Sequence, residues 1–156
     1  MTMNWDHVFA ECARMRAYFV AESEKVLAKA AEAIRAEDRS DFSSWLRISV
    51  EMAKAQGMFE HFKHPPSDYY HWAEDLNLNK VYADRLPLVS KEFRRYSKDV
   101  YPFIDIQAIL HLCSAAVRNA GRRRRLRASY FRMIRANGGT YVSWQTFRRR
   151  TRVKWR

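Results

Sequence analysis

The first 56 residues of this 156-residue chain contain no glycine and no proline, and the whole chain has four of each. Both residue types disfavour helices, so their absence favours long helices over a sheet in this part of the chain. Long apolar runs are also lacking. The most apolar stretch, 103–117, contains Asp105, Gln107 and His111 and is too short to span a bilayer.

Cysteine is scarce, with two residues in the chain. Cys12 and Cys113 both lie among apolar residues at helical spacing, which predicts buried free thiols instead of a disulfide framework. The opening residues, MTMNWDHVF, have neither the basic start nor the apolar run of a signal peptide. The sequence therefore predicts a soluble or peripheral protein, and a reducing or neutral compartment fits the cysteine content.

Acidic residues are absent from the last 39 positions. Residues 118–156 hold 14 Lys and Arg and no Asp or Glu, whereas residues 1–117 hold 15 Lys and Arg against 17 Asp and Glu. The charge pattern predicts two parts, an elongated helical stalk domain (1–117) and an arginine-rich C-terminal extension (118–156). Such a cationic block predicts an anionic partner, which can be nucleic acid, acidic lipid headgroups or an acidic protein face.

Hydrophobic residues make up 47% of the chain and aromatic residues 14%, which is enough for a core. Apolar residues recur at helical spacing from about 4 to 36, with Asn4 as a candidate N-cap. A short polar turn (36–41) precedes a second helical segment that stops at Pro65-Pro66. We expect an all-α, elongated fold in which a long N-terminal helical hairpin is followed by shorter helices and a basic C-terminal extension.

The shorter helices are expected within 67–87, over 88–100, and over 104–120, where Gly121 closes the last one. An arginine-coated helix with an inward apolar stripe then runs to Gly138-Gly139. The pattern of residues 140–147 fits a strand, a loop or a helix.

The second helical segment, 41–66, carries two apolar stripes and little polar surface. One stripe follows Trp45, Ile48 and Met52 at steps of three and four, and the other lies beside it. A helix that is apolar on two sides predicts a sandwich between the first helix and a helix of a partner protein. The residues expected at the partner interface are Trp5, Phe9, Trp45, Ile48, Met52, Phe59 and Phe62.

Catalytic and metal sites are not indicated. His61, His64 and His71 lie near one another in the sequence, but no cysteine or well-spaced carboxylate completes a metal site, so solvated histidines are expected. The carboxylates are spread along helix faces, and there is no nucleophile motif or glycine-rich phosphate loop. We therefore expect no catalytic residues, no metal and no cofactor.

The extension suggests two kinds of anion contact, a helix-turn-helix that binds nucleic acid and a cationic segment that docks on an acidic surface. A helix-turn-helix over 122–150 is one alternative, because Val142-Ser143 and Thr146 follow a glycine turn and precede three arginines. Against it, the double glycine lengthens the turn and Trp144 is an unusual residue to face a groove. The residues expected to contact an anionic partner or lipid are Arg122, Arg123, Arg124, Arg125, Arg127, Arg148, Arg149 and Arg150.

Three segments resemble subunit d of the mitochondrial F-type ATP synthase, in the same order: NWDHVF (4–9), DFSSWLRISVEMAKAQGMFEHFKHPP (41–66) and YPFIDIQAI (101–109). Within them, the residues that match in kind are Ala53-Lys54-Ala55, Gly57, Phe59-Glu60, Pro65-Pro66 and Pro102-Phe103. The resemblance covers about residues 4–110 and leaves the extension without a counterpart.

This resemblance implies a non-catalytic subunit of the peripheral stalk, or stator, which braces the catalytic head against rotor torque. Its partners would be a subunit b-like helix and neighbouring stalk subunits, on the matrix side of the mitochondrial inner membrane. Anionic lipid such as cardiolipin is a compatible ligand of the extension. No Arg- and Ser-rich transit peptide is visible, so import would need another signal. The alternative is a small helical nucleic-acid-binding protein that uses the extension.

Overall fold

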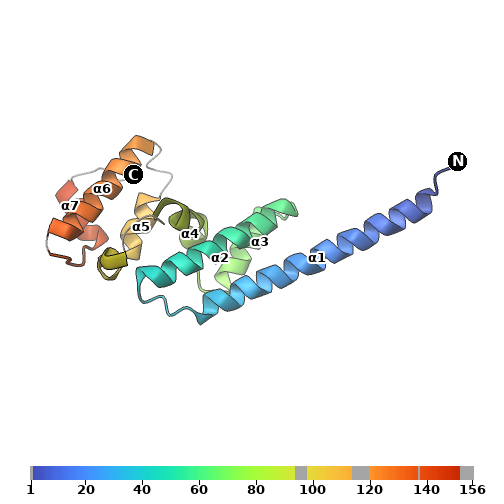
Figure 1. The fold of residues 1–156 in the computed structure, drawn as a ribbon, viewed down its shortest axis with the longest axis horizontal. Coiled ribbons are helices and arrows are strands. Elements are labelled where there is room, and N and C mark those ends of the chain that lie inside the picture. Colours follow the sequence, from blue (N-terminus) through green and yellow to red (C-terminus); the bar gives the residue numbers. More distant parts are fainter. Residues whose placement is uncertain (1, 94–97, 114–119, 137, 152–156) are drawn as a thin grey trace.

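The computed structural model describes residues 2–93, 98–113, 120–136 and 138–151. Over these residues the chain is helical apart from loops and one isolated bridge between Ile104 and Val142, so the expected all-α fold is confirmed. Figure 1 shows helices α2 to α7 grouped together and α1 extending beyond them as a single rod. The elements are α1 (Trp5–Ala36), α2 (Phe42–His61), α3 (Pro66–Glu74), α4 (Lys80–Phe93), the 3-10 helix η1 (Lys98–Phe103), α5 (Ile106–Leu112), α6 (Ala120–Ala136) and α7 (Trp144–Thr151).

The long helical hairpin forms as the sequence predicts. The side chain of Asn4 caps α1 by accepting a hydrogen bond from the backbone N–H of His7 at 3.3 Å. Asp41 caps α2 in the same way, through the N–H of Ser44 at 2.9 Å. Both caps satisfy N–H groups that have no partner within the helix, which sets where each helix begins.

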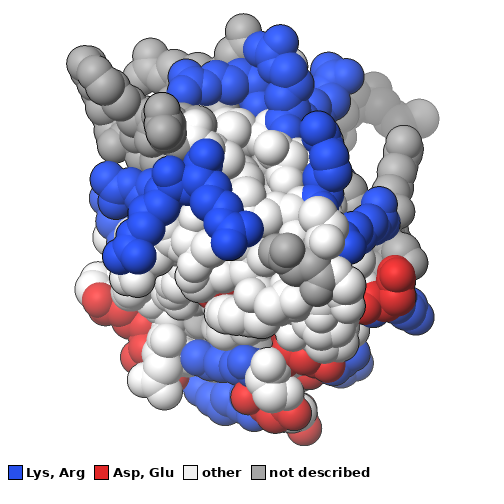
Figure 2. Space-filling view, turned by 90° about the vertical axis from the view of Figure 1, so that its left-hand side faces the viewer, with Lys and Arg blue, Asp and Glu red and all other residues white. Residues whose placement is uncertain are grey.

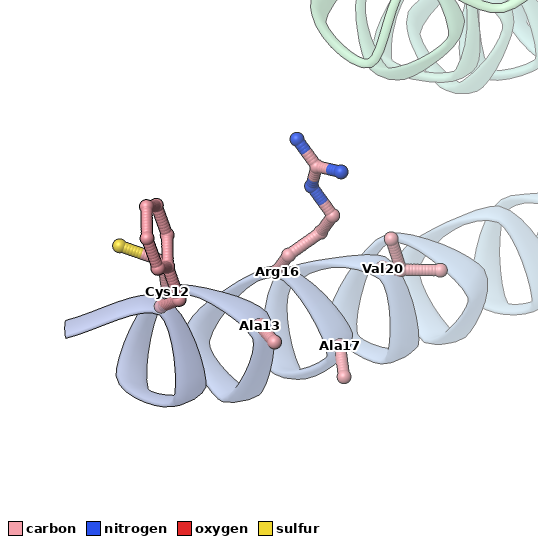
Figure 3. Close-up of a pocket in the computed structure, with 6 residues that line it drawn as sticks. Cys12, Ala13, Arg16, Ala17 and Val20 are labelled. Atoms are coloured by element: carbon pink, nitrogen blue, oxygen red, sulfur yellow. The ribbon is translucent and has the colours of Figure 1, made fainter. Parts of the chain in front are cut away.

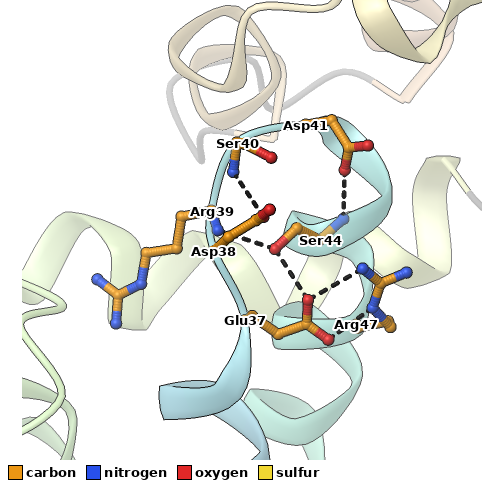
Figure 4. A network of polar contacts seen from close by, with 7 residues as sticks. All are labelled: Glu37, Asp38, Arg39, Ser40, Asp41, Ser44 and Arg47. Carbon is orange, nitrogen blue, oxygen red and sulfur yellow. Dashed lines mark hydrogen bonds and ion pairs between the residues drawn. The ribbon is translucent and has the colours of Figure 1, made fainter.

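The turn between α1 and α2 is held by a polar network (Figure 4). The carboxylate of Glu37 accepts two hydrogen bonds from the Arg47 guanidinium, at 2.6 and 3.0 Å, and a third from the hydroxyl of Ser44. The hydrogen bonds from Arg47 lower the pKa of the Glu37 carboxyl. Arg39 adopts a left-handed φ of 56°, and its N–H donates to Ser44. These contacts join the end of α1 to the first turns of α2.

Helix α2 is covered by its own chain. It packs against α4 and α1, and it also contacts α3 and η1. Ile48, Met52 and Ala55 have no exposed surface. The expectation that a partner helix covers the second side of α2 is therefore wrong for these positions, because α4 returns along α2.

Helix α4 runs through Pro87, where the sequence placed a boundary between two shorter segments. Proline has no N–H to donate to the carbonyl four residues earlier, which belongs to Ala83. The Tyr69 hydroxyl, from α3, donates to that carbonyl at 2.6 Å. One turn later, the Ser49 hydroxyl of α2 donates to the carbonyl of Leu86 and accepts from the N–H of Ser90. Tyr69 thus satisfies the carbonyl that the proline leaves unpaired, and Ser49 ties the following turn of α4 to α2.

The boundary expected at Gly121 is also wrong. Helix α5 ends at Leu112, and Gly121 lies in the first turn of α6. The expected end at Gly138-Gly139 is confirmed, because both glycines have left-handed φ values, 66° and 79°. The undecided segment 140–147 forms a short extended stretch and then the start of α7.

The hydrophobic core is continuous from α1 to α7. Phe93 of α4 lies between the rings of Phe42 and Phe131, with ring centroids 6.2 and 6.1 Å away. The hydroxyl of Tyr130, on α6, donates to the Val142 carbonyl at 2.6 Å. The boundary between 1–117 and 118–156 therefore marks a change in charge, but both parts share one hydrophobic core because α6 and α7 pack into it.

Candidate functional site

The first half of α1 lies outside this core. From Trp5 to Ala21 every side chain is exposed except that of Val8, which is half-buried. We call residues 5–21 the α1 overhang. Trp5 and Phe9 keep 58% and 66% of their surface exposed. Figure 1 shows the overhang reaching past the ends of α2 and α3. At 1.5 Å per residue its length is roughly 25 Å.

The exposed apolar side of the overhang continues the side of α1 that packs on α2. In the second half of α1, the packed side carries Ser23, Leu27, Ala30, Ala31 and Ile34. Moving 7 or 11 residues towards the N-terminus rotates a helical position by about 20°, so one or two such steps stay within about 40° of the packed side. Those steps lead to the exposed residues Trp5, Phe9, Cys12, Arg16, Phe19 and Val20.

A shallow hollow runs along this side of the overhang (Figure 3). The side chains of Cys12, Arg16 and Val20 rise from one side of the helix in this view, and small residues lie beside them. The hollow is lined by Phe9, Cys12, Ala13, Arg16, Ala17 and Val20, all from α1. A row of large residues beside small ones is a surface onto which the side chains of another helix can pack.

The structure separates the predicted interface residues into three groups. Trp5 and Phe9 are exposed on the overhang, where a partner can reach them. Trp45 and Phe62 are half-buried, and the Trp45 ring packs against the Tyr82 ring with centroids 5.6 Å apart. As a correction, Ile48, Met52 and Phe59 belong to the chain's own core and offer little or no surface to a partner.

Sequence reasoning did not assign Met15, Phe19 and Val20 to the interface, although all three are exposed on the overhang. The signal was present in the lengths of the two hairpin helices. α1 has 32 residues and α2 has 20, so α2 cannot cover the full length of α1. Cys12 is exposed for the same reason, which corrects its expected burial. Cys113 is buried as predicted, and burial raises the pKa of its thiol.

A second distinctive surface lies on α6 and α7. Helix α6 turns Leu126, Tyr130, Phe131 and Ile134 into the core. Its opposite side and the outer side of α7 carry exposed arginines, and we call this surface the cationic face. Its members are Arg122, Arg124, Arg125, Arg132, Arg135, Arg148, Arg149 and Arg150. Figure 2 shows Lys and Arg without Asp or Glu over the upper part of this end of the molecule, whereas both signs of charge occur in the lower part.

Helix α7 is positioned by hydrogen bonds at its N-terminus. One oxygen of the Asp105 carboxylate accepts from the N–H of Trp144 at 2.8 Å, and the other accepts from the N–H of Gln107 at 3.0 Å. The same side chain therefore caps α5 and holds the first N–H of α7. The Trp144 ring stacks on His111 of α5, with centroids 4.1 Å apart.

Two arginines expected to contact an anionic partner are partly or largely enclosed. The Arg127 guanidinium donates to the Glu92 carboxylate at 2.9 Å, and the two side chains are 11% and 19% exposed. Arg127 therefore joins α6 to α4 through Glu92, which corrects its predicted contact with an anionic partner. Arg123 is half-buried, whereas Arg122, Arg124, Arg125, Arg148, Arg149 and Arg150 are exposed.

The histidines near α3 take part in local contacts. His64 lies 3.1 Å from the Asp68 carboxylate, and His71 lies 3.7 Å from Glu74. Within the described ranges, no three potential ligands come close enough together to hold a metal ion. No helix in the same ranges is long and apolar enough to cross a membrane.

No family model, curated protein or solved structure matches this chain. The overhang and the cationic face are the two surfaces that bear on function, and the resemblance to subunit d stays a prediction.

Proposed function

We propose that this chain is a non-catalytic scaffold subunit that docks a helix of a partner protein along the α1 overhang. One observation carries the proposal: the side of α1 that packs on α2 continues, uncovered, beyond the end of α2. A partner helix on the overhang would take the place that α2 takes on the second half of α1.

The chemistry of the overhang favours a protein partner over a lipid surface. Its charges are mixed, with Asp6 and Glu11 beside Arg14 and Arg16, and Arg14 pairs with Glu11. Helices that lie on membranes instead carry a polar side rich in Lys and Arg. Burying an exposed aromatic side chain contributes about 1.5–3 kcal/mol, so Trp5, Phe9 and Phe19 together support stable docking.

The resemblance gives this proposal its specific form. The chain would be a structural subunit of the peripheral stalk of a mitochondrial F-type ATP synthase, peripheral to the inner membrane on the matrix side. The overhang would then lie along a subunit b-like helix. A stator transmits torque along its length, and a helix of 32 residues offers such a lengthwise contact. The chain would contribute no catalytic residue or cofactor to the complex.

The test is complex formation with the soluble helical segment of subunit b from the same organism, measured by size-exclusion chromatography with light scattering. We expect a defined complex, which the double variant Trp5→Ser/Phe9→Ser abolishes. The matched control is Val81→Ser/Tyr141→Ser, which removes two apolar residues exposed elsewhere and should leave the complex intact.

Two outcomes would overturn the proposal. A chain that stays monomeric and does not bind the subunit b segment would exclude the stalk assignment. A dimer of the chain alone that the overhang variant dissociates would identify a second copy as the occupant, in place of another protein.

A further inference from the structure

The cationic face plays no part in the proposed contact of the overhang. Figure 1 places α6 and α7 at the end of the molecule opposite the start of α1. Residues 118–156 contain no acidic residue, and eight of their arginines lie exposed on the face, so the face requires an explanation of its own.

The outer side of α6 combines arginines with small residues. Gly121, Arg125, Ala128, Arg132 and Arg135 recur at steps of three and four and are all exposed. The small residues between the arginines leave room for an extended polyanion to approach the helix closely. From residue 125 to residue 135 the row is about 15 Å long, which is similar to the roughly 12 Å width of the DNA major groove.

Helix α7 adds further exposed polar residues to the cationic face. The Phe147 ring contacts the Tyr130 ring of α6 with centroids 5.2 Å apart, so the two helices touch. Gln145, Arg148 and Arg149 are exposed on the outer side of α7. Gln and Arg are side chains that pair with adenine and guanine edges in the major groove.

The position of Trp144 removes one objection to nucleic-acid binding. The sequence suggested that this tryptophan would face a groove, but its side chain is buried against His111. The N–H of Trp144 is held by Asp105, and the Ser143 hydroxyl accepts from the N–H of Thr146 at 3.2 Å. The start of α7 is therefore fixed to the body, and its outer side is left to polar residues.

The type of cation favours phosphate recognition. Residues 120–151 contain ten arginines and no lysine. The planar guanidinium fork donates two parallel hydrogen bonds to phosphate oxygens or to guanine, which an ammonium group cannot do. Insertion into a lipid surface would need exposed apolar residues on α6, and its large apolar residues point into the core.

We propose that the cationic face binds double-stranded nucleic acid. The arginines of α6 contact the phosphate backbone, and the outer side of α7 faces a groove. The proposal is independent of the partner contact on the overhang.

The experiment measures fluorescence anisotropy of a labelled DNA duplex, and of an RNA duplex of the same sequence, with the full chain. Binding should weaken steeply as salt rises from about 50 to 200 mM, with a logarithmic slope of about −0.9 for each phosphate contact. The variant Arg125→Ala/Arg132→Ala/Arg135→Ala should lose at least about tenfold in affinity and reduce the slope by about 2–3. Circular dichroism checks that the helices are retained.

The matched control is Lys29→Ala/Arg35→Ala/Lys91→Ala, which removes the same charge from exposed positions on α1 and α4. It should bind within about twofold of the unaltered chain. An equal loss in both variants would show that only net charge matters and would overturn the site.

Two further outcomes would also overturn the proposal. One is the absence of duplex binding at low salt. The other is equal or tighter binding to phosphatidylserine vesicles, which would assign the face to lipid headgroups. The overhang variant Trp5→Ser/Phe9→Ser should bind the duplex normally, so failure of the partner proposal and failure of this one are distinguishable.

Discussion

The hydroxyl of Ser49 on α2 accepts a hydrogen bond of 2.8 Å from the backbone N–H of Ser90 on α4. In an uninterrupted helix this N–H would donate to the carbonyl of Leu86. The Ser49 hydroxyl also donates a hydrogen bond to the Leu86 carbonyl, so it is bonded to both groups. A single side chain of α2 therefore maintains the hydrogen bonding of α4 next to Pro87, and it fixes how the two helices pack.

Replacing Ser49 by alanine should destabilise the fold by about 1–3 kcal/mol, because the backbone groups of Leu86 and Ser90 lose their hydrogen bonds to its hydroxyl. Urea unfolding followed by circular dichroism measures this change. Ser67→Ala, at an exposed serine of α3, is the control and should change stability by less than about 0.5 kcal/mol. An unchanged urea midpoint for Ser49→Ala would mean that the backbone groups of α4 are satisfied without the Ser49 hydroxyl.

Replacing Asp105 by alanine should destabilise the chain by about 2 kcal/mol, since the N-cap of α5 and the hydrogen bond to the first N–H of α7 contribute about 1 kcal/mol each. Thermal unfolding measures the effect. Asp75→Ala, at the exposed end of α3, serves as the control. If the loss matched that of a single cap, the hydrogen bond to Trp144 would contribute nothing.

The Glu92–Arg127 pair should be strongly coupled. Glu92→Leu alone leaves a largely enclosed guanidinium without its carboxylate and should cost up to about 3 kcal/mol, whereas Glu92→Leu/Arg127→Met should recover most of that loss. A double-mutant cycle by urea unfolding gives the coupling energy. Additive effects of the two single variants would show that the pair is solvated and weak.

Stability should depend on the protonation of His111. Burial, followed by the nearby charges of Arg85 and Arg148, lowers its pKa from the ordinary value of 6.5. The unfolded chain then binds a proton more readily than the folded chain, so stability is retained above pH 6.5 and falls as the pH drops below it.

Thermal unfolding across this pH range tests the prediction. His111→Phe keeps an aromatic ring against Trp144 but cannot titrate, so it should flatten the pH dependence. His61→Phe changes an exposed histidine and should leave the dependence as it is. A profile that is the same for His111→Phe and the unaltered chain would assign the effect to other groups.

The sequence predicted helices well where local signals act alone. Asn4 begins α1 through its own side chain, and Gly138 and Gly139 follow the end of α6 with the φ values that glycine permits. The boundary expected at Pro87 was wrong because the Ala83 carbonyl, which the proline cannot reach with an N–H, accepts a hydrogen bond from Tyr69 on another helix. A contact that depends on the tertiary fold leaves no mark in the local pattern.

The candidate surfaces were predicted in part for a similar reason. Periodicity identified the apolar stripes of both hairpin helices, but it could not show that α4 covers Ile48 and Met52. Charge counting identified the extension as cationic, but it could not show that Arg127 turns inward to Glu92. Exposure at each position depends on which helices become neighbours.

Because α1 contains no glycine or proline, the side chains at its two ends keep a fixed orientation relative to each other. The overhang joins the body through continuous helix, with no flexible joint between Trp5 and Ala36. Each residue of a helix turns its neighbour by about 100°, so one amino acid inserted near position 22 would swing the docking row a quarter of the way around the axis. The packing of α1 on α2 would thus set the orientation of a bound partner around the axis of α1.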